Sequence, residues 1–123
     1  MARITEKNED LILNVVNNVV KERGYDNIKA NADGYEVPRQ FTRTRTDETI
    51  TPDISAVKNG RKNFFEIAVK NEKEQRTVSK WKLLSQLADF KGGKLFVIAP
   101  RGHYRFAQNL IDDYNIEAKM IRM

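Results

Sequence analysis

Residues 51–70 read TPDISAVKNGRKNFFEIAVK, and this segment gives the clearest structural signal in the chain. Two runs typical of β-strands, 51–57 and 62–70, flank the dipeptide Asn59-Gly60. Asn-Gly favours a type I′ turn, because both central residues of that turn need a positive φ. The segment is therefore predicted to form a β-hairpin in which Lys58 pairs with Arg61.

This register places Asp53 directly opposite Glu66. Two carboxylates in that relation have Cβ atoms about 4.5–5.5 Å apart and repel each other, which weakens a sheet. A sequence tolerates such a pair most readily when a positive group, usually a metal ion, lies between the two acids. Asp53 and Glu66 are thus predicted to bind a metal ion. The competing interpretation is that each is an edge-strand charge solvated on its own.

The remaining segments alternate between helical and strand patterns. The predicted helices are 5–23, 71–90 and 102–114, and the further predicted strands are 35–41, 94–99 and 116–121. The run 94–99 is continuously apolar, which is typical of a buried parallel strand. The Thr-rich segment 42–49 is either a mobile loop or an exposed strand end. The predicted order of elements is α-β-β-β-α-β-α-β, a single α/β domain over residues 1–123.

Pro52-Asp53, Glu66 and a following lysine resemble the motif of the PD-(D/E)XK nuclease superfamily, in which an aspartate on one strand precedes an acid-x-lysine on the next. The first six predicted elements also match the αβββαβ core of that superfamily in order. The resemblance implies a restriction-endonuclease-like fold, with a central mixed β-sheet flanked by helices. The chain departs from the motif at Ala68, where the family has its lysine; the nearest lysine on the same strand face is Lys70.

The resemblance implies that Asp53 and Glu66 hold Mg²⁺ (or Mn²⁺), and that Lys70 orients the attacking water or stabilises charge on the phosphorus. In an alternative register, Lys70 keeps the family position, Ala68 marks the missing acid and Glu66 has migrated. Gln86 begins a segment similar to the Gln-x-x-x-Tyr helix motif of the RecB-type branch, and Glu9 matches an acid that some branches add to the site. Both are equally explained as solvated helix residues.

Lysine and arginine number 22 against 17 acids, so the formal net charge is +5. Basic residues lie on both sides of the hairpin in the sequence, as expected where a polyanion is drawn over a metal centre. Those predicted to contact nucleic-acid phosphates are Arg43, Arg45, Lys73, Arg76 and Lys80. An ordinary solvated surface would also account for this charge.

The chain contains no cysteine, which excludes disulfides and cysteine-based zinc sites. No run is typical of a signal peptide or a membrane span, so we expect a cytoplasmic protein without a membrane partner. The function predicted by the resemblance is a metal-dependent endonuclease that hydrolyses DNA phosphodiester bonds, expected as a homodimer because one small protomer covers only a short stretch of duplex. The alternative, favoured by Ala68, is a catalytically degenerate nuclease-fold protein that binds nucleic acid.

Overall fold

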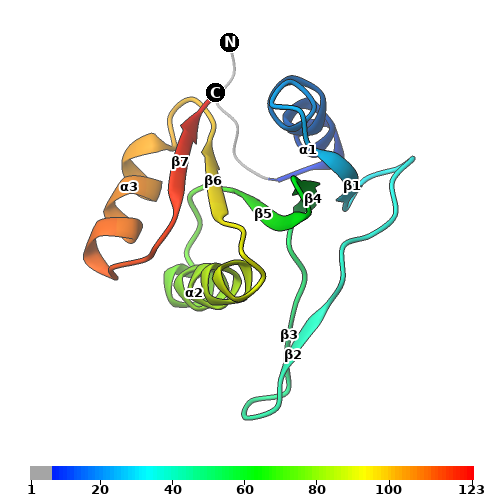
Figure 1. The fold of residues 1–123 in the computed structure, drawn as a ribbon. Helices are drawn as coiled ribbons and strands as arrows, with labels where there is room; N and C mark the ends of the chain where they lie inside the picture. The colour runs from blue at the N-terminus through cyan, green and yellow to red at the C-terminus, as the bar shows by residue number, and fades with distance from the viewer. Residues whose placement is uncertain (1–6) are drawn as a thin grey trace.

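A five-stranded mixed β-sheet with the strand order β1-β4-β5-β6-β7 forms the centre of the computed structural model, which describes residues 7–123 (Figure 1). The first three strands in this order are antiparallel, and β5, β6 and β7 run parallel. The predicted α/β class with a mixed sheet is confirmed. The strands span Asp26–Ala30 (β1), Ile54–Lys58 (β4), Arg61–Ile67 (β5), Leu95–Ala99 (β6) and Lys119–Arg122 (β7).

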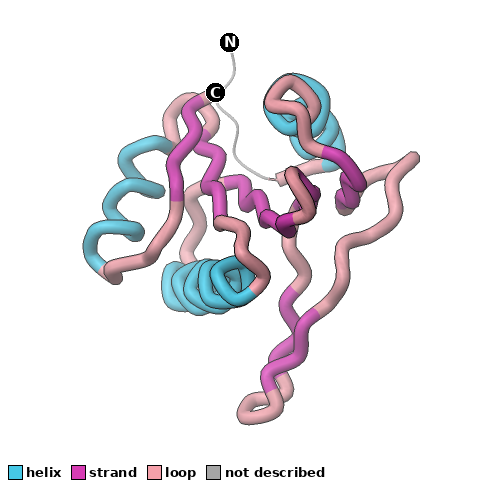
Figure 2. The backbone as a smooth tube through the Cα atoms, in the orientation of Figure 1, coloured by secondary structure: helices cyan, strands magenta, loops and turns pink. Residues whose placement is uncertain are grey.

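Helices cover both faces of the sheet, and each face has its own apolar core (Figures 1 and 2). One face packs against α1 (Glu9–Val15) and its continuation as a π-helix, η1 (Val16–Val20). The other face packs against α2 (Glu74–Phe90) and α3 (Tyr104–Asp113). Side chains alternate between the faces with period two, so Phe65 lies in the α1 core and Phe64 in the α2 core.

The predicted hairpin is confirmed, including its register. Lys58 pairs with Arg61, and the ladder continues to Ile54 opposite Phe65. Asn59 and Gly60 have φ angles of 53° and 75°, as a type I′ turn requires. The turn chemistry therefore fixed which residues of β4 and β5 lie opposite each other.

The predicted first strand is wrong in position. The strand that pairs with β4 is β1, whereas residues 36–40, which include Pro38, are irregular. A proline has no main-chain N–H to donate to a ladder, which disfavours a strand there. The following segments, β2 (Phe41–Arg43) and β3 (Glu48–Ile50), pair with each other as a separate ribbon that projects from the body of the domain (Figure 1). We call this ribbon the β2–β3 arm.

Side-chain capping fixes the start of α1 but not that of α2. Oδ1 of Asn8 caps α1 by accepting a 2.9 Å hydrogen bond from the Leu11 amide, so the helix starts at Glu9; residue 5, where the predicted helix begins, lies outside the described residues. Helix α2 has no side-chain cap from residues 7–123, and Oδ1 of Asn71 accepts a hydrogen bond from the Lys73 amide in a turn before the helix. Gly93 ends the turn after α2, where a Cβ would lie 1.8 Å from the carbonyl oxygen of Lys62.

The predicted buried parallel strand is confirmed, since every residue of β6 is buried. Within residues 7–123, no helix is both long and apolar enough to cross a membrane.

Candidate functional site

Asp53 and Glu66 lie against each other at the end of the hairpin that is far from its turn. Asp53 immediately precedes β4, and its amide donates a 2.7 Å hydrogen bond to Oε2 of Glu66 on β5. In return, Oδ2 of Asp53 accepts a 2.9 Å hydrogen bond from the amide of Ile67. The structure thus brings together the two carboxylates that the register placed opposite each other, and we call them the acid pair. Their role as metal ligands stays a prediction.

Two lysines from distant elements compensate the charge of the acid pair. Lys7, just before α1, places its Nζ 2.8 Å from Oδ2 of Asp53 and 3.8 Å from Oε1 of Glu66. Lys80, on α2, places its Nζ 3.0 Å from Oε1 of Glu66 and 3.9 Å from Oδ1 of Asp53. The four side chains form one cluster with two negative and two positive charges.

The acid pair is removed from solvent, Glu66 completely so and Asp53 with 8% of its surface exposed. Oε1 of Glu66 is buried without a hydrogen bond from any residue in 7–123, although Lys80 Nζ is near enough for an ion pair. A buried carboxylate oxygen without a hydrogen bond is costly, because it has lost its water without full replacement. Its charge is balanced by the ammonium groups of Lys80 at 3.0 Å and Lys7 at 3.8 Å, so a cation that binds here has to take the place of one of them.

Burial and neighbouring charges move the two carboxyl pKa values in opposite directions. Burial alone would raise the pKa of Asp53, but the ammonium groups of Lys7 and Lys80 and the hydrogen bonds from Lys7 and Ile67 outweigh it, so this pKa lies below its ordinary value. The pKa of Glu66 is raised, first by burial and then by the adjacent charge of Asp53. Burial would lower the pKa of Lys7, yet both carboxylates together raise it. Lys7 therefore stays charged beside the acid pair.

Lys70, the lysine predicted to assist catalysis, does not reach the acid pair. Strand β5 ends at Ile67, so Lys70 lies beyond the sheet, where its side chain is exposed. Its amide donates a 3.0 Å hydrogen bond to Nδ1 of His103. His103 is buried, although a position near a helix start would suggest an exposed side chain. Ala68, at the family position of the lysine, is buried in the core beneath α2. Among the described residues, the lysines that contact the acid pair are instead Lys7 and Lys80.

The two further candidate residues lie away from the acid pair. Glu9 begins α1, and its Oε1 accepts a 2.7 Å hydrogen bond from the Asp33 amide. Gln86 is exposed on α2, six residues beyond Lys80 and hence about 9 Å farther along the helix axis. Neither makes a hydrogen bond or ion pair with the acid pair among the described residues.

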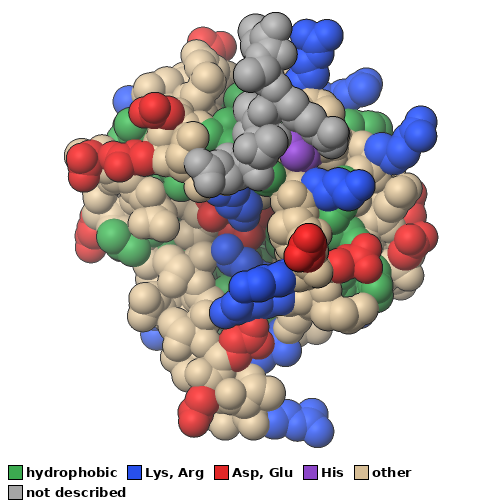
Figure 3. Space-filling view, turned by 180° about the vertical axis from the view of Figure 1, so that it is seen from behind, with side chains coloured by type: hydrophobic (Ala, Val, Ile, Leu, Met, Phe, Trp, Pro, Cys, Tyr) green, Lys and Arg blue, Asp and Glu red, His purple; other side chains and the backbone are tan. Residues whose placement is uncertain are grey.

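The five residues predicted to contact phosphates divide into two groups. Arg43 on the β2–β3 arm donates a 3.0 Å hydrogen bond to the carbonyl of Ser79, and Arg76 lies 4.0 Å from a carboxylate oxygen of Glu48. Lys80 is engaged by the acid pair, which leaves Arg45 and Lys73 exposed without an ion pair in residues 7–123. Figure 3 accordingly shows basic and acidic side chains interleaved on the face that it presents.

Sequence reasoning missed Lys7 and assigned Lys80 a different role. Lys7 is 46 residues from Asp53, and no local pattern connects the two. Lys80 lies between Val78 and Trp81, both buried, and is therefore at the edge of the buried face of the helix. The packing of α2 on the sheet decides which sheet residues lie opposite this edge of the helix.

The acid pair provides two carboxylates for a cation; residues 7–123 contain no group of three or more acid, histidine or cysteine side chains arranged to hold a metal. Two carboxylates suit Mg²⁺, which retains several waters and completes its shell with phosphate oxygens. In comparisons with known proteins, no family model, curated protein or solved structure matches the chain.

Proposed function

We propose that the protein is a metal-dependent nuclease with a restriction-endonuclease-like fold and the acid pair as its metal site. The observation that carries the proposal is that the carboxylates of Asp53 and Glu66 lie side by side and buried, with Oε1 of Glu66 partnered, among residues 7–123, by ammonium groups alone. Asp53 and Glu66 come from adjacent strands, so the hairpin orients both before any ligand arrives.

The arrangement of the sheet supports this fold assignment. A helix precedes three antiparallel strands, of which β5 carries Glu66, and α2 then leads to the parallel strand β6. Once the separate β2–β3 arm is set aside, this is the order αβββαβ that the sequence resemblance implies. Asp53 immediately precedes the second strand of that order and Glu66 lies on the third, in keeping with the acids of the superfamily motif.

Mg²⁺ or Mn²⁺ held by Asp53 and Glu66 would polarise a phosphodiester and lower the pKa of a bound water. The side chain suited to contact the substrate is Lys80, which approaches the acid pair from α2 and remains partly exposed. An ammonium at this position attracts phosphate and stabilises negative charge that develops on it. Arg45 and Lys73 supply further positive charge outside the cluster.

Lys7 has a different part in this proposal. Its ammonium contacts both carboxylates, and its side chain is 31% exposed, so it can leave the cluster without opening the core. We infer that Lys7 balances the charge of the acid pair while no divalent cation is bound. A cation that enters takes over this role from Lys7.

A second candidate function is a nucleic-acid-binding protein that has this fold but no activity. The observation in its favour is that both carboxylates already have ammonium partners, which makes the cluster electrically neutral without a metal. In that case the cluster is a structural element of the sheet end.

Calorimetric titration with Mn²⁺ and Mg²⁺, with and without DNA, distinguishes the two candidates. The nuclease proposal expects one cation site per chain whose affinity rises with DNA, together with cleavage of supercoiled plasmid or branched DNA that EDTA prevents. DNA binding without any cation binding would instead support the inactive nucleic-acid-binding protein.

A further inference from the structure

Four cations lie at or beside the ends of four neighbouring strands, β4, β5, β6 and β7. These are Lys58 at the end of β4, Arg61 at the start of β5, Lys94 immediately before β6 and Lys119 at the start of β7. We call these four residues the basic row. None of them was among the residues that the sequence indicated for nucleic-acid contacts.

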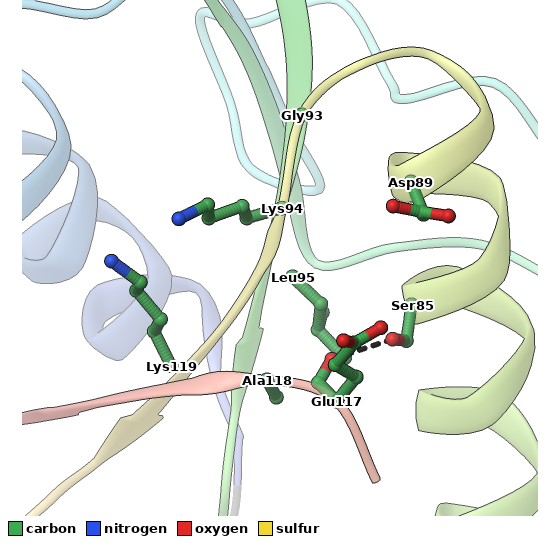
Figure 4. Close-up of a pocket in the computed structure, with 8 residues that line it drawn as sticks. All are labelled: Ser85, Asp89, Gly93, Lys94, Leu95, Glu117, Ala118 and Lys119. Atoms are coloured by element: carbon green, nitrogen blue, oxygen red, sulfur yellow. Dashed lines mark hydrogen bonds between the residues drawn. The ribbon is translucent and has the colours of Figure 1, made fainter.

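Strand register places the whole basic row on one face of the sheet, the α1 face. Lys58 and Arg61 are direct partners across the hairpin. Lys119 is the partner of Phe96, a residue of the α1 core, and Lys94 precedes Phe96 by two positions and so shares its face. Figure 4 shows the side chains of Lys94 and Lys119 on one side of their strands, and Asp89 and Glu117 on the other side, toward α2.

The charges of the basic row are not neutralised by acids. All four side chains are exposed, and none forms an ion pair with an acid in the part of the chain that the structure describes. Lys58 is the most constrained, since its Nζ donates a 2.7 Å hydrogen bond to the carbonyl of Arg23. The pKa of Lys94 lies below its ordinary value, chiefly because the side chain of Lys119 lies close to it.

The basic row contributes four of the 22 cations of the chain, whose formal net charge is +5. Lys7 and Lys80 at the candidate site, by contrast, are opposed by the acid pair. The basic row is therefore a surface that can attract a polyanion.

We propose that the basic row binds the phosphate backbone of a nucleic acid, at a surface separate from the acid pair. Neighbouring strands lie about 4.8 Å apart, and the register shifts Lys94 by two residues from Arg61 and Lys119 by two more, so the four cations follow a diagonal line of about 20 Å across the α1 face. A nucleic-acid backbone presents phosphates in regular succession, which such a line can meet one after another. An acidic polypeptide has no comparable regular spacing.

The separation from the acid pair makes this a second contact. Arg61 and Glu66 are five residues apart on β5, which corresponds to about 17 Å along the strand. Lys119 is level with Phe65, but it lies two strands away from Glu66 and on the α1 face, whereas Glu66 faces α2. The basic row thus holds a segment of nucleic acid other than the one at the acid pair, and its binding does not depend on the metal or on cleavage.

The test is to replace two cations of the basic row and compare them with two matched cations elsewhere. The test variant is Lys94→Gln/Lys119→Gln, and the control is Lys21→Gln/Lys82→Gln, which removes the same charge from exposed positions on or beside α1 and α2. Binding of a short fluorescent duplex is measured by anisotropy in EDTA over a range of salt concentrations. Thermal melting confirms that both variants are folded.

We expect the test variant to lower the slope of log affinity against log salt by about 1.8 on duplex DNA, since each lost phosphate contact accounts for about 0.9. The control should change the slope by less than half of that. Equal losses in the two variants would overturn the proposal, and so would wild-type binding that is independent of salt. Competition by poly-glutamate as strong as that by an oligonucleotide of equal charge would assign the surface to an acidic protein instead.

The outcome is separable from that of the proposed nuclease activity. If the basic row binds nucleic acid but the protein is not a nuclease, the salt slope of the test variant falls as expected, while the wild-type protein neither binds divalent cation nor cleaves DNA. If the reverse holds, cleavage requires the acid pair but the two double variants bind DNA alike.

Discussion

The amide of Asp53 donates a 2.7 Å hydrogen bond to Oε2 of Glu66, so the main chain of one strand end orients the carboxylate of the next. Oδ2 of Asp53 is held in the same way by the amide of Ile67. Among residues 7–123, Oδ1 of Asp53 and Oε1 of Glu66 accept no main-chain hydrogen bond, and both lie within 4.0 Å of Lys80 Nζ. The hairpin thus fixes one oxygen of each acid and leaves the other available to a ligand.

We expect Asp53→Asn and Glu66→Gln each to reduce DNA cleavage by more than about a hundredfold, because a metal site contributes several kcal/mol of transition-state stabilisation and each 1.36 kcal/mol is tenfold in rate. Both substitutions nearly preserve side-chain volume. DNA binding measured in EDTA should be unchanged or tighter, since a negative charge has been removed. Wild-type cleavage rates in both variants would assign the activity to another site.

Lys80 and Lys70 form a matched pair for testing which lysine serves the reaction. We expect Lys80→Gln to lower the single-turnover cleavage rate by about 10²–10³-fold, the usual cost of removing one group that stabilises developing charge. Lys70→Gln should stay within about twofold of the wild type, because its side chain is exposed beyond β5. The reverse result would return the catalytic role to Lys70 and show that the segment after β5 rearranges on substrate.

Lys7→Met should increase the affinity of the acid pair for Mn²⁺, because the substitution removes an ammonium 2.8 Å from Asp53 while keeping the apolar stem. We expect at least a tenfold lower Kd, equivalent to about 1.4 kcal/mol. Calorimetric titration measures it, with Lys21→Met as a control for the loss of one charge. Weaker Mn²⁺ binding by Lys7→Met than by the control would contradict the displacement of Lys7 by a cation.

Because the pKa of Glu66 is raised, this residue makes the stability of the metal-free protein depend on pH. A carboxyl whose folded-state pKa lies above its ordinary value of 4.5 contributes stability that is present below that value and is lost as the pH rises through the folded-state pKa. Glu66→Gln resembles the protonated form, so it should remove this loss and be the more stable protein at pH 7. Chemical unfolding from pH 4 to pH 8 in EDTA measures the difference.

Asp53 should behave in the opposite sense, which supplies an internal comparison. Its pKa lies below the ordinary value of 3.8, so its contribution is present above that value and is lost as the pH falls through the folded-state pKa. Asp53→Asn should therefore be less stable than the wild type at pH 7. A stability gain in Asp53→Asn together with a loss in Glu66→Gln would reverse the assignment of the two carboxyl groups.

The sequence predicted the acid pair because its geometry is local. A type I′ turn at Asn59-Gly60 sets the register, and the side-chain period of two determines which face each residue occupies. The position of Asp53 opposite Glu66 therefore follows from one hairpin. The buried strand β6 was equally predictable, since an uninterrupted apolar run is typical of a strand that is covered on both faces. The strand at the β1 edge was not, because residues 26–30 carry little hydrophobic pattern and pair through an irregular register.

Only the tertiary structure decided which cations meet the acid pair. Lys80 reaches Glu66 because Val78, Trp81 and Leu84 set the rotation and height of α2 on the sheet, and packing of this kind depends on shapes contributed by the whole chain. Lys7 reaches Asp53 because α1 packs on the other face, which leaves the segment before it at the same sheet end. Local turn and strand rules act over a few residues, so by itself the sequence could place two acids side by side but could not identify the lysines beside them.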